Sequence, residues 1–321
     1  MTNILTNLHA ELHQMTLASR LYYEEGRTQQ EIAEVMNISR PTVSRLLVRA
    51  REENIVNITI TDPFETKTAL ADQFRQVTGL EKTIITQAIP KGEVLNLKIL
   101  GISAARYLEN ELMPGAIVGV GWGRTLLSVV ESLGQPIVAD LTFVPLTGGL
   151  GQISPSFQVN ELIRCMAEKF NANWRQFYLP AIVQDDDARN NLLSTGDVKN
   201  VTNTWETMNT ALVGIGNVSF DTELNMLFAK YLDQSTRDRL HAAGAVGDIC
   251  MRFFDGDGRS IEDGLRGVIG IDLEKLHRIS NVIGVASGAS KAKAILGAIR
   301  GGLIKTLITD DVTARAILTL F

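Results

Sequence analysis

The alternation of apolar and polar positions between Thr28 and Arg51 predicts two short helices joined by a tight turn. In the first helix, the apolar face consists of Ile32, Ala33, Val35 and Met36. In the second helix, apolar residues recur at 3.6-residue spacing, at Val43, Leu46, Leu47 and Ala50. Residues 37–39 break the pattern between them, and Ile38 is the expected buried residue of the turn. Ser39 is a good N-cap residue, and Pro41 falls in the first turn, where a missing N–H costs little.

The other face of the second helix carries mostly small, hydroxylated or cationic side chains. From Asn37 to Arg51 there are four arginines and no acidic residue. Arginine binds guanine edges or phosphates, and serine and threonine bind phosphates and bases. An amphipathic helix pair with a solvated arginine face is the alternative, but the turn, the cap and the acid-free second helix together favour a helix-turn-helix. The predicted DNA contacts are Gln29, Arg40, Thr42, Ser44, Arg45 and Arg49.

The segments on either side complete a small domain. Leu5, Leu8, Leu12 and Met15 stand at heptad spacing, which fits either a short contact between two copies or a helix packed on its own domain. Residues 15–25 form the next predicted helix, ended by Gly26. The β-rich segment 55–60 predicts a wing or a closing strand, and Asp62-Pro63 marks a boundary. We therefore expect two domains, residues 1–61 and residues 62–321.

The second domain alternates strand-like runs with helical patterns. The runs lie at residues 83–86, 116–121, 141–146, 211–216, 282–286 and 307–309. Helices are predicted from Glu93 to about Leu112, from Thr125 and from near Phe157, and others follow the last two runs. Such alternation is typical of a doubly wound, mostly parallel α/β sheet covered by helices on both faces.

Composition restricts the class of protein. The formal net charge of −5 means that DNA binding must come from a local basic face such as residues 37–51. The two cysteines, Cys165 and Cys250, are far apart in sequence and each lies in an apolar context, which favours a reducing compartment over a zinc site or a disulfide. We find no run of 18 apolar residues and no signal-peptide pattern, and therefore expect a cytoplasmic protein without membrane partners.

Three of the predicted strand-to-helix joints are rich in glycine, at residues 119–125, 147–152 and 287–291. Ligands of open parallel sheets bind beyond the carboxyl ends of the strands. The glycines of a single joint would be explained by the backbone geometry of a turn. Three such joints in one domain indicate a pocket in which backbone N–H groups bind an anion such as phosphate.

The sequence gives little support for dinucleotide, calcium or other metal binding. Gly119-Val-Gly-Trp-Gly-Arg departs from the dinucleotide-binding spacing G-x-G-x-x-G. The stretch Asp255-Gly-Asp-Gly-Arg259 resembles a calcium loop only at its start and predicts a hairpin turn. The four histidines, His9, His13, His241 and His277, lack metal-ligand spacing, so we expect neither a metal nor a cofactor.

Two charged residues near these joints conflict with their surroundings. Lys291 falls in the first turn of a predicted helix, where the helix dipole disfavours a cation. A bound phosphate would resolve the conflict through the ammonium and the N–H groups of residues 289–291. Asp248 lies in an apolar stretch, where sugar hydroxyls or Lys291 could satisfy its carboxylate. The alternatives are a solvated lysine and a strand-end cap.

The order of these parts resembles the SorC/DeoR-type family of bacterial sugar-operon regulators. The resemblance rests on residues 17–23, 28–33 and 38–47 at the DNA-binding end, and on residues 119–125, 244–255, 286–295 and 307–310 in the effector domain. It implies a phosphosugar-isomerase-like fold, operator DNA and a phosphorylated sugar as partners, and a tetramer or paired dimers. Asp248 and Lys291 fall at its effector-contacting positions. Some relatives carry lysine where this chain has Thr147, so imine capture of a sugar aldehyde is not available there.

The sequence thus predicts a transcriptional regulator, a repressor of a carbohydrate-utilisation operon controlled by a phosphorylated sugar. The alternative is a phosphosugar isomerase or deaminase with an accessory DNA-binding domain, for which no histidine or other base is evident. A third possibility, a purely structural second domain, leaves the glycine-rich joints unexplained. The predicted effector contacts are Gly121, Trp122, Gly123, Thr125, Thr147, Gly148, Gly149, Asn160, Asp248, Gly288, Ser290 and Lys291.

Overall fold

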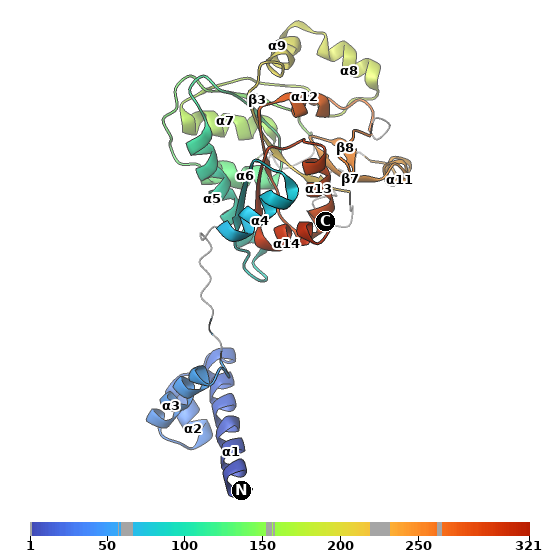
Figure 1. Cartoon of the computed structure of the whole chain (residues 1–321). Coiled ribbons are helices and arrows are strands. Elements are labelled where there is room, and N and C mark those ends of the chain that lie inside the picture. Colours follow the sequence, from blue (N-terminus) through green and yellow to red (C-terminus); the bar gives the residue numbers. More distant parts are fainter. Residues whose placement is uncertain are drawn as a thin grey trace. The chain divides into compact units, whose positions relative to one another are not determined.

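The computed structural model describes residues 2–56, 58, 67–151, 156, 158–218, 232–261 and 265–321 (Figure 1). The chain divides into two compact units, Met1–Thr61 and Asp62–Phe321. Among the described residues, no helix has the length and apolar character needed to cross a membrane.

The first unit is built from helices packed around one small core. Its elements are α1 (Thr2–Ser19), the π-helical turn η1 (Arg20–Glu24), α2 (Gln29–Met36) and α3 (Arg40–Glu52). The sequence suggested separate helices before and after residue 15, but α1 runs through that point and continues directly into η1. The core consists of Met15, Ala18, Leu21, Ile32, Ala33, Val43, Leu46, Leu47 and Ala50.

Side-chain caps fix the ends of the two central helices. Thr28 and Glu31 form a capping box at the start of α2, and Asn37 ends that helix in the left-handed region at φ 52°. Ser39 accepts the N–H of Thr42 at the start of α3, which confirms the predicted cap. Val35 was assigned to the apolar face of α2 but is 56% exposed, because α2 packs only through its other apolar residues.

Two predictions for this unit fall partly on residues outside the described set. Of the predicted wing, Ile55 and Val56 pack against the helical core, whereas residues 57, 59 and 60 lie outside the described residues. Leu5 and Leu8 belong to the heptad stripe, and their side chains lie outside the described set. Met15 is fully buried and packs in the core of its own unit, whereas Leu12 is partly exposed.

The second unit contains the predicted parallel sheet. Its strands are β1 (Lys82–Thr86), β2 (Ile117–Val120), β3 (Thr142–Pro145), β4 (Asn173–Trp174), β5 (Thr210–Gly214), β9 (Asn281–Val285) and β10 (Thr306–Asp310). Their order is β1-β10-β9-β5-β2-β3-β4, and all the neighbouring pairs are parallel. The two-residue strand β4 had no signal in the sequence.

Helices cover both faces of this sheet, as the alternating pattern predicted (Figure 1). One core lies under α5 (Glu93–Glu111), α6 (Arg124–Ser132) and α7 (Val159–Phe170). The other core lies under α4 (Thr68–Thr78), α9 (Gly196–Thr204), α12 (Leu273–Arg278), α13 (Ala292–Arg300) and α14 (Asp311–Leu318). The remaining described helices are α8 (Asp186–Leu193), α11 (Gln234–Ala242) and the 3₁₀ turn η3 (Ala289–Lys291).

A small antiparallel sheet, which the sequence pattern did not predict, stands beside the main one. It consists of β6 (Gly216–Asn217), β7 (Ala245–Ile249) and β8 (Arg252–Asp255). The predicted turn follows β8, where the Asp255 carboxylate accepts the N–H groups of Asp257 and Arg259, each at 2.9 Å. This sheet places Asp248 beside the carboxyl end of β5, because Asp248 pairs in register with Gly216.

The winding of the main sheet reverses at β2. From β2 the chain passes to β3 and β4 on one side, and then returns to β5 on the other side of β2. A crevice opens at such a reversal because the two following connections leave in opposite directions. The carboxyl ends of β2 and β5 therefore mark the expected ligand site of this unit.

Candidate functional site

The exposed face of α3 carries most of the predicted DNA contacts. Arg40 and Arg45 are exposed, and Thr42 and Ser44 are half-buried. Within the described part of the chain, neither arginine forms an ion pair, so both guanidinium groups are available. Thr42 also contacts the Ser39 hydroxyl at 2.8 Å, which couples it to the helix cap.

Arg49 differs from these two arginines. Its guanidinium pairs with Glu53 at 2.8 Å on α3 and with Glu11 on α1. Both carboxylates raise the pKa of Arg49, Glu53 most strongly. The sequence assigned Arg49 to phosphate, but the structure uses it to join α1 to α3. Periodicity within α3 could not reveal this contact, because Glu11 belongs to another helix.

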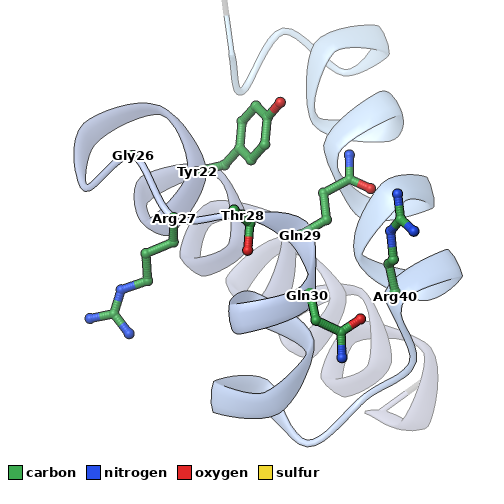
Figure 2. A pocket seen from close by; sticks show the side chains of 7 residues that line it. All are labelled: Tyr22, Gly26, Arg27, Thr28, Gln29, Gln30 and Arg40. Carbon is green, nitrogen blue, oxygen red and sulfur yellow. The ribbon is translucent and has the colours of Figure 1, made fainter.

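An open groove of about 630 Å³ lies beside the start of α3 (Figure 2). It is lined by Tyr22, residues 26–30 and Arg40, which come from the end of the first helix, the start of α2 and the start of α3. Gln29, a predicted DNA contact, lies in it. No lining residue is acidic.

A pocket of about 430 Å³ occupies the reversal point of the main sheet. Its walls come from the residues that follow β2, β5 and β9, from the end of β10, and from β7 of the small sheet. Eight of the predicted effector contacts line it: Gly121, Trp122, Gly123, Thr125, Asp248, Gly288, Ser290 and Lys291. Residues as distant in sequence as these meet because parallel strands end at one edge of the sheet.

Sequence reasoning missed several residues of the same pocket. They are Glu93, Asn96, Leu97, Arg124, residues 214–217, Cys250, Ser287 and Asp310. Arg124 had a signal, since it is a cation at the start of a predicted helix, which is the same conflict that singled out Lys291. Asn96 is committed elsewhere, because its side chain bonds both the N–H and the carbonyl of Ile89.

Asp248 is a buried carboxylate in the pocket wall. It accepts the N–H of Met251 at 3.1 Å and lies against Gly216, where a Cβ would stand 2.0 Å from Oδ1. Burial raises the pKa of Asp248 to about 6, while the Met251 N–H and the charge of Lys291 act to lower it. The group is therefore an acceptor that titrates near neutral pH.

Lys291 lines the pocket from η3. Its ammonium donates to the carbonyl oxygen of Ile215 at 2.9 Å. Burial lowers the pKa of Lys291, the Asp248 carboxylate opposes that shift, and the charge of Arg124 adds to it. The backbone N–H of Lys291 donates to the Gly288 carbonyl at 2.9 Å, so it is not one of the free N–H groups that the sequence suggested.

The second cation of the pocket stands at the start of α6. Gly123 is the N-cap residue of α6 with φ 117° and makes no side-chain cap bond. A residue with a side chain would be strained there, which explains the glycine. Arg124 follows it and is exposed. The helix start and the arginine together make this end of the pocket electropositive.

The joint at residues 147–149 lies outside the pocket, contrary to prediction. The Thr147 hydroxyl donates to the Ile269 carbonyl at 3.1 Å, and the Gly148 N–H donates to the same oxygen at 2.9 Å. The Gly149 N–H donates to the Leu179 carbonyl at 2.8 Å. These groups hold neighbouring loops to the end of β3, so their donors are not available to a ligand.

Asn160 is also a structural residue. Its amide donates to the Phe177 carbonyl and its side-chain oxygen accepts the Phe177 N–H, each at 3.1 Å. The pair fastens the segment after β4 to α7. The prediction that Asn160 contacts an effector has no support in this geometry.

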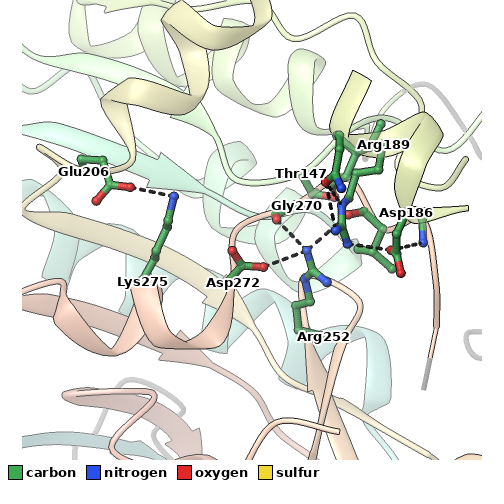
Figure 3. A network of polar contacts seen from close by, with 12 residues as sticks. Thr147, Asp186, Arg189, Glu206, Arg252, Gly270, Asp272 and Lys275 are labelled. Carbon is green, nitrogen blue, oxygen red and sulfur yellow. Dashed lines mark hydrogen bonds and ion pairs between the residues drawn. The ribbon is translucent and has the colours of Figure 1, made fainter. Parts of the chain in front are cut away.

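A polar network fixes the loops near the pocket (Figure 3). The Arg252 guanidinium pairs with Asp272 at 2.9 Å and donates to the Val268 and Gly270 carbonyls, each at 3.2 Å. Arg189 pairs with Asp186 at 2.8 Å, beside Arg252. The network joins β8 to segments preceding α12 and thereby steadies the turn that carries Cys250. Burial raises the pKa of Cys250 to about 12, so it remains a thiol.

Comparison with known proteins covers nearly the whole chain. A family model described as "Putative sugar-binding domain" matches residues 62–319, and the model of sigma-70 region 4 matches residues 20–53. The chain is 32% identical over 303 residues to the sorbitol operon regulator of Klebsiella pneumoniae, covering 94% of this chain and 96% of that protein. It is 34% identical over 304 residues to the deoxyribonucleoside regulator of Bacillus subtilis (strain 168), covering 94% and 95%.

Solved structures give the same result. The crystal structure of full-length SorC from Klebsiella pneumoniae matches with a TM-score of 0.76 at 32% identity, covering 95% of this chain and 97% of that one. A probable sor operon regulator from Shigella flexneri matches with a TM-score of 0.72 at 30% identity, over 78% of this chain. The sigma-70 match coincides with the helix-turn-helix, and the sugar-binding match spans the α/β unit. The chain belongs to the SorC-type family of sugar-binding transcriptional regulators.

Proposed function

We propose that a phosphorylated sugar binds the pocket of the α/β unit and thereby controls operator binding by the helix-turn-helix. The observation that carries this proposal is the joint presence of Lys291 and Asp248 in one pocket at the reversal point of the sheet. A ligand that carries both an anionic group and hydroxyls satisfies both residues. A phosphorylated sugar has this combination.

The cationic groups favour a phosphate over a neutral sugar. Lys291 and Arg124 both line the pocket, and the start of α6 adds the partial positive charge of its N–H groups. The charge of Arg124 also lowers the pKa of Lys291, so the two cations repel one another. A phosphate between them would remove that repulsion and form charge-assisted hydrogen bonds.

We assign the hydroxyls of the sugar to Asp248, which lines the same pocket. Asp248 offers carboxylate oxygens that accept hydroxyl protons, and Trp122 also lines the pocket. The Asn217 amide, which donates to the Ser290 carbonyl at 3.2 Å, joins β6 beside Asp248 to the η3 turn that carries Lys291. An isolated buried carboxylate is costly, so hydroxyl donors from a ligand would stabilise it.

The relatives support a role at a carbohydrate operon. They are a sorbitol operon regulator and a deoxyribonucleoside regulator. We propose that this chain represses such an operon and that the sugar phosphate alters its affinity for the operator. Because a single helix-turn-helix buries little surface, we also propose a dimer or tetramer that reads paired half-sites. Light scattering that finds a monomer with and without DNA would contradict this assembly.

An isomerase is the competing function, and one observation favours it: the pKa of Asp248 near 6 suits a general base. Against it, Asp248 is buried and already accepts the Met251 N–H, and the pocket lining contains no histidine that could serve as partner acid. An assay for aldose–ketose conversion of each bound sugar phosphate distinguishes a sensor from an enzyme.

Calorimetry tests the proposed ligand class. A panel of sugar phosphates, the matching free sugars and inorganic phosphate should be titrated into the full chain. We expect a sugar phosphate to bind more tightly than either its free sugar or phosphate alone. Equal binding of a free sugar and its phosphate ester would contradict the role of the cations.

A further inference from the structure

We propose that Tyr22, Gln29 and Arg40 form a seat for one phosphate group of the DNA backbone, separate from the base-reading side chains of α3. The inference rests on the proposed binding of operator DNA and assigns a new residue, Tyr22, to that function. It also moves Gln29 and Arg40 from a general list of DNA contacts to a defined chemical role.

The three side chains lie on one side of the groove beside the start of α3. Figure 2 shows Tyr22, Gln29 and Arg40 pointing toward the same side, whereas Arg27 and Gln30 point the opposite way. They come from three different elements, namely η1, the start of α2 and the start of α3. Their convergence therefore depends on the tertiary structure and could not be found from helical periodicity.

Their chemistry matches a phosphodiester. Tyrosine, glutamine and arginine supply a hydroxyl, an amide and a guanidinium, all of which donate to phosphate oxygens. No lining residue of the groove is acidic, so no carboxylate competes for the anion. Arg27 is the other cation of the groove, but it pairs with Glu25 at 2.8 Å and points away from the three.

The π-helical turn explains how Tyr22 reaches this position. Residues 20–24 are wound more widely than an α-helix, which rotates the following side chains relative to α1. Tyr22 packs edge-on against Tyr23, with ring centroids 4.9 Å apart, and remains 37% exposed. The neighbouring ring thus orients a tyrosine whose hydroxyl stays accessible. Tyr23 is similarly exposed but does not line the groove.

Phosphate contacts and base contacts give different binding signatures. Removing a phosphate contact lowers the affinity for all DNA sequences alike. Removing a cationic contact also lowers the dependence of affinity on salt. The test uses fluorescence anisotropy with two duplexes: one recovered by selection from a random pool with the wild-type protein, and one of mixed sequence. Affinity is measured from about 50 to about 200 mM salt, where phosphate contacts change it most.

Two variants and two matched controls decide the proposal. Tyr22→Phe should lower the affinity for both duplexes about three- to tenfold without changing the salt slope, because it removes one uncharged donor. Arg40→Gln should lower the affinity for both duplexes and lower the salt slope by about one. The controls Tyr23→Phe and Arg27→Gln should change affinity and slope much less, since neither side chain belongs to the seat.

The outcomes separate this inference from the proposed function. If the wild-type chain binds no duplex, the proposed DNA binding itself fails. If the wild-type chain binds but Tyr22→Phe matches Tyr23→Phe, or Arg40→Gln matches Arg27→Gln, then only the phosphate seat is refuted. Loss of discrimination between the two duplexes in Arg40→Gln would assign Arg40 to bases instead. Thermal unfolding of each variant confirms that the helical unit remains folded.

Discussion

The ammonium of Lys291 is held 2.9 Å from the carbonyl oxygen of Ile215, directly after strand β5. This bond uses one of the three donors of the ammonium and leaves two that can face a ligand. It also holds the side chain in the pocket lining rather than in solvent. A cation that is already positioned loses little conformational entropy when it binds an anion.

Replacing Lys291 should therefore abolish effector control. We expect Lys291→Met to lose calorimetric binding of a sugar phosphate while its affinity for operator DNA stays at the wild-type level. Methionine keeps the length of the side chain and removes the charge, so the pocket wall should survive. Lys293→Met is the matched control, because Lys293 is exposed on α13 and does not line the pocket. Wild-type effector affinity in Lys291→Met would refute the role of this cation.

Asp248 should make the stability of the α/β unit depend on pH. Its folded pKa of about 6 lies above the ordinary value of 3.8, so the folded chain binds the proton more tightly than the unfolded chain. Its contribution to stability is thus complete below about pH 3.8 and is lost as pH rises through about 6. Asp248→Asn lacks this titration. Between pH 4 and pH 7 the wild type should lose about 2 kcal/mol relative to Asp248→Asn.

Urea unfolding of both proteins across that range measures the difference. Lys291 is the charge that acts on the pKa of Asp248, while burial lowers the pKa of Lys291 and the Asp248 carboxylate raises it. The pH dependence of the difference between the two proteins therefore reports the titration of Asp248 together with the response of Lys291 to its loss. A constant difference at all pH values would show that Asp248 ionises as readily in the folded chain as in the unfolded chain.

Arg45 and Arg49 should behave differently although both lie on α3. If Arg45 reads a guanine through two hydrogen bonds, Arg45→Ala should cost about 1–3 kcal/mol and relax specificity at one base pair. Arg49→Ala should leave the salt slope nearly unchanged and lower the thermal midpoint slightly, because Arg49 is paired with Glu11 and Glu53. A drop of about one in the salt slope of Arg49→Ala would restore its original assignment to phosphate.

Gly101 should be indispensable to the packing of α5 on α6. A Cβ at Gly101 would stand 2.4 Å from the Ser128 hydroxyl and 2.5 Å from the Ser128 carbonyl oxygen. Gly101→Ala should cost about 1–3 kcal/mol of stability, more than the gain in helix propensity. Ser128 also donates to the Leu97 carbonyl at 3.0 Å, and Leu97 lines the pocket, so effector affinity should fall as well.

Gly196→Ala is the control for that experiment. Gly196 also lies in a helix, α9, but an added Cβ meets nothing within 4 Å. We expect Gly196→Ala to leave stability unchanged or to raise it slightly. Equal losses in the two variants, measured by urea unfolding, would mean that steric contact with Ser128 is not the cause.

The sequence predicted those features that depend on local periodicity. Val43, Leu46, Leu47 and Ala50 were placed correctly because helical spacing alone decides which face of α3 is buried. The six strand-like runs were likewise found because buried parallel strands are continuous apolar segments. The Lys291 and Asp248 positions emerged from conflicts between a charge and its local context, and such conflicts are visible in sequence.

The remaining features depend on partners that are distant in sequence. Thr147 and Gly148 resembled ligand-binding residues, but the Ile269 carbonyl, 122 residues after Thr147, accepts both of their donors. In the sequence Arg49 resembled an unpaired cation, but in the structure it pairs with Glu11 of α1. A glycine-rich joint or an exposed helix position shows which donors exist. It does not show which of them the folded chain has already used.

The position of β1 at the edge of the main sheet has a consequence for biosynthesis. Among the described strands its one neighbour in that sheet is β10, and Lys82 pairs in register with Thr306. A ribosome makes the chain from the N-terminus, so β1 must wait for more than two hundred further residues before its hydrogen-bonding partner exists. The described core residues of the first unit lie between residues 15 and 56, so this unit can fold as it emerges. A newly made chain therefore acquires its helix-turn-helix before it acquires the completed pocket of the α/β unit.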